Sequence, residues 1–187
     1  MVIFEKCGVE NTDEALSLAF DKAIELGTDV VGASSSGFVA KKAVQIAKEK
    51  GFKGKLIIVT LTYGMVASEP GKNRMDDKTR EALKEEGCLL VTATHLLSGA
   101  ERGLSSKFGG VYPVEIIAYT LRMFSQGTKV CVECAGMALD NGAIEYGKPI
   151  VAFGGTGHGC DTVAVLTPAH GNNILDTKIH EILCKPY

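Results

Sequence analysis

The sequence predicts an α/β fold of three layers, in which a mainly parallel sheet carries helices on both faces. Strand-like and helical stretches alternate along the chain, which is the pattern of such folds. The stretch at residues 55–60 is a nearly continuous apolar run, as expected of a strand covered on both faces. The 187 residues contain no repeat or linker, so residues 1–187 are expected to form a single domain.

Helices are indicated by apolar residues at helical spacing, together with residues that begin and end a helix. In the first one, the apolar positions run from Leu16 to Ile24, Asn11 and Glu14 have capping-box spacing, and Gly27 ends the helix. The other expected helices are residues 38–50 before Gly51, 76–86 with Asp76 as cap, a short helix opened by a capping box of Ser98 and Glu101, 113–124 begun by Pro113, and 128–141 before Gly142.

Short apolar stretches between these helices predict the strands. Ligands of such folds bind beyond the carboxyl ends of the strands, at a point where the strand order reverses. Four segments at these ends are rich in Gly, Ser, Thr and His, namely residues 34–37, 60–64, 94–102 and 154–159. The expected strands are residues 2–4, 30–33, 55–60, 88–92, 149–153, 161–167 and 178–184.

Composition excludes several classes of function. The net charge is −2 and no basic stripe is present, so no nucleic-acid partner is expected. No apolar run is long enough to span a membrane, and the N-terminus lacks the layout of a signal peptide. The six cysteines are scattered, which suits reduced thiols. We therefore expect a cytoplasmic protein with no membrane partner; a homo-oligomer is a further expectation.

The segment that follows the second strand has the features of an anion site. Three hydroxyl residues and a glycine (Ser34, Ser35, Ser36 and Gly37) precede the helix that begins at Phe38. A helix N-terminus presents free backbone N–H groups and the positive end of the helix dipole, which suits a phosphate or carboxylate. Plain helix capping is the alternative, although a cap needs only one serine. The sequence predicts a partner that is a phosphorylated small molecule.

The chain resembles the C-terminal domain of pyruvate kinase over about residues 11–186. The resemblance is carried by residues 31–40 (VGASSSGFVA), the strand that ends at residues 58–60, and the run at residues 161–167. It implies that the loop at residues 34–37 holds a phosphate of an effector. The barrel that carries the kinase chemistry is absent, so pyruvate kinase activity is not expected.

Four further segments resemble stand-alone, archaeal-type relatives of that domain. They are residues 62–65, 70–75, 94–102 and 154–159. This resemblance implies FMN as the cofactor, whereas the residue spacing alone indicates only an anion pocket. Two functions stay open: a flavin-dependent redox role, and a non-catalytic module that senses a sugar phosphate or nucleotide. The residues expected to line the site are Ser34, Ser35, Ser36, Gly37, Phe38, Thr60, Thr62, Tyr63, Lys72, Arg74, Thr94, His95, Ser98, Arg102, Gly155, Thr156, Gly157 and His158.

Each candidate also has a structural interpretation. Lys72 and Arg74 lie in a long connection and either bind a phosphate or face water. His95 either contacts the ligand or makes a structural hydrogen bond. The glycines of residues 154–159 either admit a ligand or allow positive φ angles. Phe38 and Tyr63 either stack on a ring or pack in the core.

The cysteines offer two weaker hypotheses. Cys131 and Cys134 have metal-like spacing, but a single pair is weak support for zinc, and packing in the core is favoured. Cys160 could act as a nucleophile only if its pKa were lowered. No metal ligand is therefore assigned, and no catalytic residue.

Overall fold

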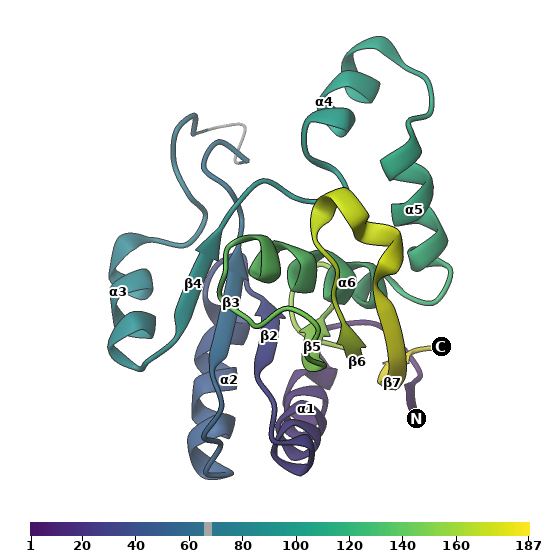
Figure 1. The fold of residues 1–187 in the computed structure, drawn as a ribbon. Coiled ribbons are helices and arrows are strands. Elements are labelled where there is room, and N and C mark those ends of the chain that lie inside the picture. The colour runs from purple at the N-terminus through teal and green to yellow at the C-terminus, as the bar shows by residue number, and fades with distance from the viewer. Residues whose placement is uncertain (66–68) are drawn as a thin grey trace.

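The protein is built on one seven-stranded sheet, in the order β1-β7-β6-β5-β2-β3-β4 (Figure 1). The computed structural model describes residues 1–65 and 69–187. Strand β6 runs antiparallel to β5 and β7, and the other neighbouring pairs are parallel. The strands are β1 (Val2–Phe4), β2 (Val30–Ala33), β3 (Leu56–Thr60), β4 (Leu89–Thr92), β5 (Ile150–Gly154), β6 (Thr162–Thr167) and β7 (Lys178–Pro186).

Helices cover both faces of this sheet, which confirms the predicted α/β fold with a mainly parallel sheet. One core lies under α1 and α2 and includes Phe20 and Phe153. The other lies under α5 and α6 and includes Ile57 and Leu166. The helices are α1 (Thr12–Leu26), α2 (Phe38–Glu49), α3 (Asp77–Glu85), α4 (Gly99–Phe108), α5 (Pro113–Arg122) and α6 (Gln126–Asp140), with short 3-10 turns at Val9–Asn11 and Gly171–Asp176.

Most helix ends follow the predicted residues. Gly27 adopts the left-handed conformation that ends α1, with φ 62°. Asp76 accepts a hydrogen bond from the amide of Thr79 and thereby caps α3. Pro113 occupies the first turn of α5. Among the described residues, no helix has both the length and the apolar character needed to cross a bilayer.

Both predicted capping boxes are wrong, because Asn11 and Glu101 form hydrogen bonds outside their own helix starts. The Asn11 side chain makes no cap bond and instead donates to the carbonyl of Lys6. Ser98 makes no cap bond either. Glu101 accepts from the amide of Val114 at 2.9 Å, so it serves the start of α5 rather than its own helix.

The strand order places a switch point beside β2. From β2 the chain passes through α2 to β3 and then to β4 on one side. It then returns through α4, α5 and α6 to β5, on the other side of β2. The loops that follow β2, β3 and β5 therefore meet at one edge of the sheet, which is where ligands of such folds bind.

Candidate functional site

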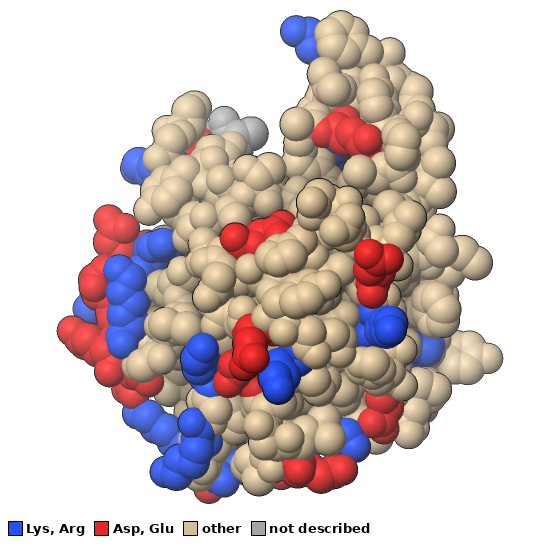
Figure 2. Space-filling model, viewed as in Figure 1, with Lys and Arg blue, Asp and Glu red and all other residues tan. Residues whose placement is uncertain are grey.

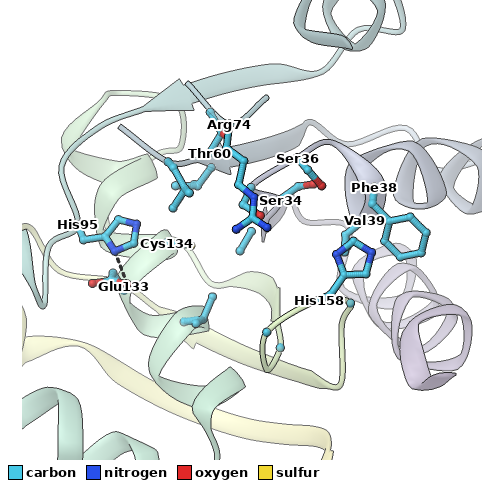
Figure 3. Close-up of a pocket in the computed structure, with 18 of the residues that line it drawn as sticks. Ser34, Ser36, Phe38, Val39, Thr60, Arg74, His95, Glu133, Cys134 and His158 are labelled. Atoms are coloured by element: carbon cyan, nitrogen blue, oxygen red, sulfur yellow. Dashed lines mark ion pairs between the residues drawn. The ribbon is translucent and has the colours of Figure 1, made fainter. Parts of the chain in front are cut away.

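A cavity of about 280 Å³ lies at this edge, between the ends of β2, β3 and β5 and helix α6 (Figure 3). The following predicted residues line it: Ser34, Ser35, Ser36, Phe38, Thr60, Arg74, His95, Gly155, Gly157 and His158. The other predicted residues are not among those that line it: Gly37, Thr62, Tyr63, Lys72, Thr94, Ser98, Arg102 and Thr156.

The hydroxyl groups of the serine loop have different roles. The Oγ atom of Ser34 accepts a hydrogen bond from the amide of Ala40 at 3.2 Å and so caps α2 from inside the protein. Ser35 and Ser36 are half-buried and line the cavity. Capping and an anion site therefore do not compete here, because one serine caps the helix and the other two face the cavity.

Gly37 serves the loop in a different way from the one expected. Its φ is 93°, a conformation that favours glycine, and an added Cβ would lie 2.4 Å from the side chain of Thr79 on α3. The glycine is thus required by the turn and by close packing against α3. The expectation that it leaves room for an anion is not supported, since it does not line the cavity.

The glycine-rich loop after β5 forms another wall. The structural interpretation of this loop holds for two of its glycines, because Gly157 and Gly159 have positive φ values of 67° and 107°. Both also line the cavity, and the admission of a ligand stays a prediction. The His158 ring stacks on Phe38, with ring centroids 4.5 Å apart. Phe38 therefore already stacks on a side chain of the protein, across the edge of the cavity (Figure 3).

The long connection after β3 contributes one cation. Arg74 extends into the cavity toward Ser34 (Figure 3), and within the described residues it forms no ion pair. The loop is fixed beside it, because the amide of Met75 donates to Asn73 Oδ1 at 2.9 Å. Lys72 instead pairs with Glu69 at 3.0 Å on the surface. Residues 66–68 of this connection lie outside the described residues.

A buried ion pair on α6 contributes Glu133 to the wall of the cavity, and it was not predicted from the sequence. Lys129 and Glu133, one turn apart on α6, are each 3 % exposed, and their charged atoms lie 2.5 Å apart. Glu133 also accepts from the amide of Leu97 at 2.8 Å. The available signal was a pair of opposite charges four residues apart on a helix that is otherwise small and apolar.

His95 lies next to this pair. Its Nδ1 is 3.9 Å from Glu133 Oε2 and 3.3 Å from Ser98 Oγ (Figure 3). Burial lowers the pKa of His95 below its ordinary value of 6.5, although the nearby carboxylate of Glu133 opposes this shift. The imidazole is therefore neutral at pH 7, with one ring nitrogen able to donate and the other to accept.

Thr60 places a buried hydroxyl, without a hydrogen-bond partner in the described part of the chain, in the wall of the cavity. The residue is 2 % exposed and lines the cavity, and its Oγ1 has no hydrogen-bond partner among the described residues. An unpaired buried hydroxyl costs about 1–3 kcal/mol. Such a group is expected where a ligand, or a water that the ligand displaces, completes the structure.

Ser98 and Arg102 line a second, wider groove of about 820 Å³ between α4 and α5. Tyr63 is 50 % exposed, and its ring centroid lies 5.9 Å from the guanidinium carbon of Arg80. Thr156 is held near the first cavity by its amide, which donates to the buried Asp161 at 3.2 Å. Thr156 therefore lies next to the first cavity, Ser98 and Arg102 belong to the second groove, and Tyr63 lies on the exposed surface.

The cysteines give no reactive centre in the described structure. Cys131, Cys134 and Cys160 are buried, and burial raises the pKa of all three thiols. The described residues contain no group of three or more His, Cys, Asp or Glu side chains that could hold a metal ion. A thiol with a raised pKa is a poor nucleophile, so the hypothesis of a catalytic Cys160 loses its support.

No protein-family model matches the chain. The resemblance to the pyruvate kinase C-terminal domain therefore stays a prediction from the sequence.

Proposed function

We propose that this chain binds a phosphorylated small molecule, with FMN as the first candidate, and that the phosphate lies at the start of α2. The observation that carries the proposal is convergence on one cavity. The N-terminus of α2, the residues Ser35 and Ser36, and the free guanidinium of Arg74 all reach it. Backbone N–H groups at a helix start and an arginine fork are the usual ligands of phosphate oxygens.

The charge balance of the cavity supports an anion. Among the described residues that line the cavity, Glu133 is neutralised by Lys129 and His95 is neutral at pH 7, whereas Arg74 is a cation without an ion-pair partner that an anionic ligand can meet. A second support is Thr60, whose unpaired hydroxyl fits a ligand with hydroxyl groups next to its phosphate. FMN and sugar phosphates both have this chemistry.

The residues present fit the phosphate-bearing end of FMN. Ser35, Ser36 and Arg74 would hold its phosphate, and when bound the cofactor would supply redox chemistry. The residues of the chain would bind and orient it, and Ser98 would keep His95 in place.

The size of the cavity favours a second candidate. Ligand pockets usually measure about 300–1,000 Å³, and this cavity measures about 280 Å³. A sugar phosphate would be held within it, whereas the flavin ring would need surface beyond it. The second candidate is thus a module that senses a sugar phosphate without catalysing a reaction.

A titration of FMN, followed by quenching of flavin fluorescence, tests the proposal. Ribose 5-phosphate is then added as a competitor to separate the two candidates. Ser35→Asp should weaken binding at least about a hundredfold, because its carboxylate repels the phosphate. Ser35→Ala and Ser106→Asp serve as controls, since the first adds no charge and the second adds the charge on the exposed surface of α4.

Two results would contradict the proposal. One is that neither FMN nor ribose 5-phosphate binds to the wild-type protein. The other is that Ser35→Asp binds them as tightly as the wild type. Reduction of the bound flavin by a nicotinamide would favour a redox role, and displacement of FMN by low concentrations of ribose 5-phosphate would favour the sensor.

A further inference from the structure

Helix α5 is apolar on two opposite sides. Its inner residues pack against the core that α6 helps to build; they are Val114, Ile117, Ala118 and Leu121. On the other side, Ile116, Tyr119 and Met123 are 56 %, 68 % and 84 % exposed. The flanks between these two sides carry Glu115, Thr120 and Arg122. A surface helix normally has polar residues opposite its core-facing side, so the large apolar side chains here mark this side as a candidate for cover by a partner.

The outer residues form one continuous stripe. Ile116, Tyr119 and Met123 are spaced three and four residues apart, so they lie on the same side of the helix. All three line the groove between α4 and α5, together with Val111, which is 78 % exposed. Exposed apolar patches of this kind mark interaction surfaces in soluble proteins.

The patch lies on the helical hairpin formed by α4 and α5. The hairpin stands away from the sheet (Figure 1), and Figure 2 shows its visible surface as mostly uncharged. The apolar side chains of the patch, each 56 % exposed or more, are Val111, Ile116, Tyr119 and Met123. They expose on the order of 500 Å², compared with the ~800 Å² that each partner buries in a standard interface, so polar groups of the same groove complete the contact.

We infer that this patch binds a second copy of the chain, with the two α5 helices packed antiparallel about a two-fold axis near Tyr119. A two-fold interface requires a surface that is complementary to itself. The stripe meets this requirement, because Ile116 and Met123 lie at similar distances on either side of Tyr119. In the antiparallel pair, Ile116 of one copy lies opposite Met123 of the other.

The charges beside the stripe have the same symmetry. Glu115 and Arg122 both line the groove, one near each end of α5. Arg122 lies over the Tyr119 ring, 4.8 Å from its centroid, and so reaches the outer side. In the antiparallel pair, Glu115 of each copy lies beside Arg122 of the other copy. Within its own chain Glu115 accepts from Ser105 Oγ through Oε1, and Arg122 donates to Gln126 through Nε, which leaves the second carboxylate oxygen and the terminal guanidinium nitrogens for a partner. This complementarity favours a second copy over an unrelated protein as the occupant.

The mass of the full chain in solution, measured by sedimentation velocity, tests the inference. We expect a dimer of twice 19.8 kDa. Tyr119→Lys should raise the dissociation constant at least about a hundredfold, because it places two like charges at the centre of the interface. Leu175→Lys is the matched control, since Leu175 is 81 % exposed outside the patch.

A charge reversal and a cross-link test the orientation. Arg122→Glu alone should weaken the dimer, and the double variant Arg122→Glu/Glu115→Arg should restore it. In a Cys7→Ser background, which removes the exposed thiol, Thr120→Cys should form a disulfide with its copy on oxidation, because the residue lies next to the axis.

Three results would overturn the inference. The first is a monomeric wild-type protein at the highest concentration reached. The second is a dimer that survives Tyr119→Lys, which would place the interface elsewhere. The third is a double variant that associates as weakly as Arg122→Glu, which would exclude the antiparallel pairing. Circular dichroism of each variant confirms that the fold is retained.

Discussion

At the scale of single residues, we expect the hydroxyl of Thr60 to lower the stability of the ligand-free protein. It is buried without a hydrogen-bond partner among the described residues. Replacing it with a methyl group of the same shape removes this cost. We expect Thr60→Val to raise the free energy of unfolding of the ligand-free protein by about 1 kcal/mol and to weaken FMN binding several-fold. Urea denaturation measures the first effect, and flavin fluorescence the second.

Thr128→Val is the matched control for this variant. Thr128 is equally buried, but its Oγ1 lies 2.9 Å from Ser125 Oγ and is therefore satisfied. The same substitution should destabilise the protein at this site. A loss of stability in Thr60→Val comparable to that in Thr128→Val would mean that the Thr60 hydroxyl has a structural partner.

His95 gives the protein a dependence on pH. Because burial lowers its pKa in the folded state, the unfolded chain binds the proton more readily. The free energy of unfolding should therefore fall as the pH drops below about 6.5, the ordinary pKa of histidine, and should not depend on His95 above that range. Urea denaturation between pH 5 and pH 8 measures this dependence.

His95→Gln should flatten that part of the pH profile. His180→Gln provides the comparison, because His180 is exposed on β7. A profile that keeps its full slope in His95→Gln would assign the dependence to other groups.

The serine loop could be identified as a candidate site from the sequence, because its three hydroxyl residues and its glycine are consecutive. The sequence pattern did not indicate Glu133, which reaches the cavity only because α6 packs across the sheet. It predicted ligand access for Gly37, whereas the contact that requires a glycine comes from Thr79, 42 positions along the chain. A sequence pattern identifies groups that are close together in the chain. The roles of Glu133 and Gly37 depend on contacts between distant segments, so no such pattern shows them.

At the scale of elements, the start of α5 depends on a side chain from α4. Glu101 accepts from the amide of Val114, one of the N–H groups that have no partner within the helix. Glu101→Ala should lower the free energy of unfolding by about 1 kcal/mol, as for the loss of a helix cap. Urea denaturation measures the change.

Glu101→Gln separates the hydrogen bond from the charge, because it keeps an acceptor oxygen in place. It should retain most of the stability. If Glu101→Ala and Glu101→Gln lose equal stability, the charge of Glu101 rather than its hydrogen bond stabilises α5.

The elements themselves were largely predictable, and the failures have a common cause. Strand and helix bounds follow apolar periodicity, which is a property of the local sequence. The two capping boxes failed because Asn11 and Glu101 bond to segments outside their own helix starts. Capping-box spacing identifies which bonds are available to a helix, and contacts outside the helix start, near or far along the chain, decide which of them form.

At the scale of the whole molecule, the rule for ligand sites in parallel sheets correctly places the loops after β2, β3 and β5 at one edge. The order of the strands could not be read from the sequence, and neither could the antiparallel direction of β6. Those depend on which strands pair across long separations. The sequence thus locates the edge of the sheet, and the packing of α6 determines which charges reach it.

The thiols report on the stability of the whole molecule. Of the six cysteines, Cys7 is exposed and the others are buried, and burial raises the pKa of Cys88 to about 11 and of Cys184 to about 12. In the folded protein, a thiol reagent should therefore label Cys7 rapidly and the buried cysteines only when the structure opens. Mass spectrometry of the labelled peptides follows each site separately.

Addition of FMN then shows whether the buried cysteines are labelled through global unfolding or through local opening of the structure. A ligand that binds only the folded state stabilises it by an amount set by its concentration relative to its dissociation constant. If the buried thiols are reached by global opening, FMN should slow the labelling of all of them by one common factor. Cys134, which lines the cavity, would be slowed more than Cys88 only if the cavity opens locally without unfolding. Labelling rates that do not change with FMN would contradict binding to the folded protein.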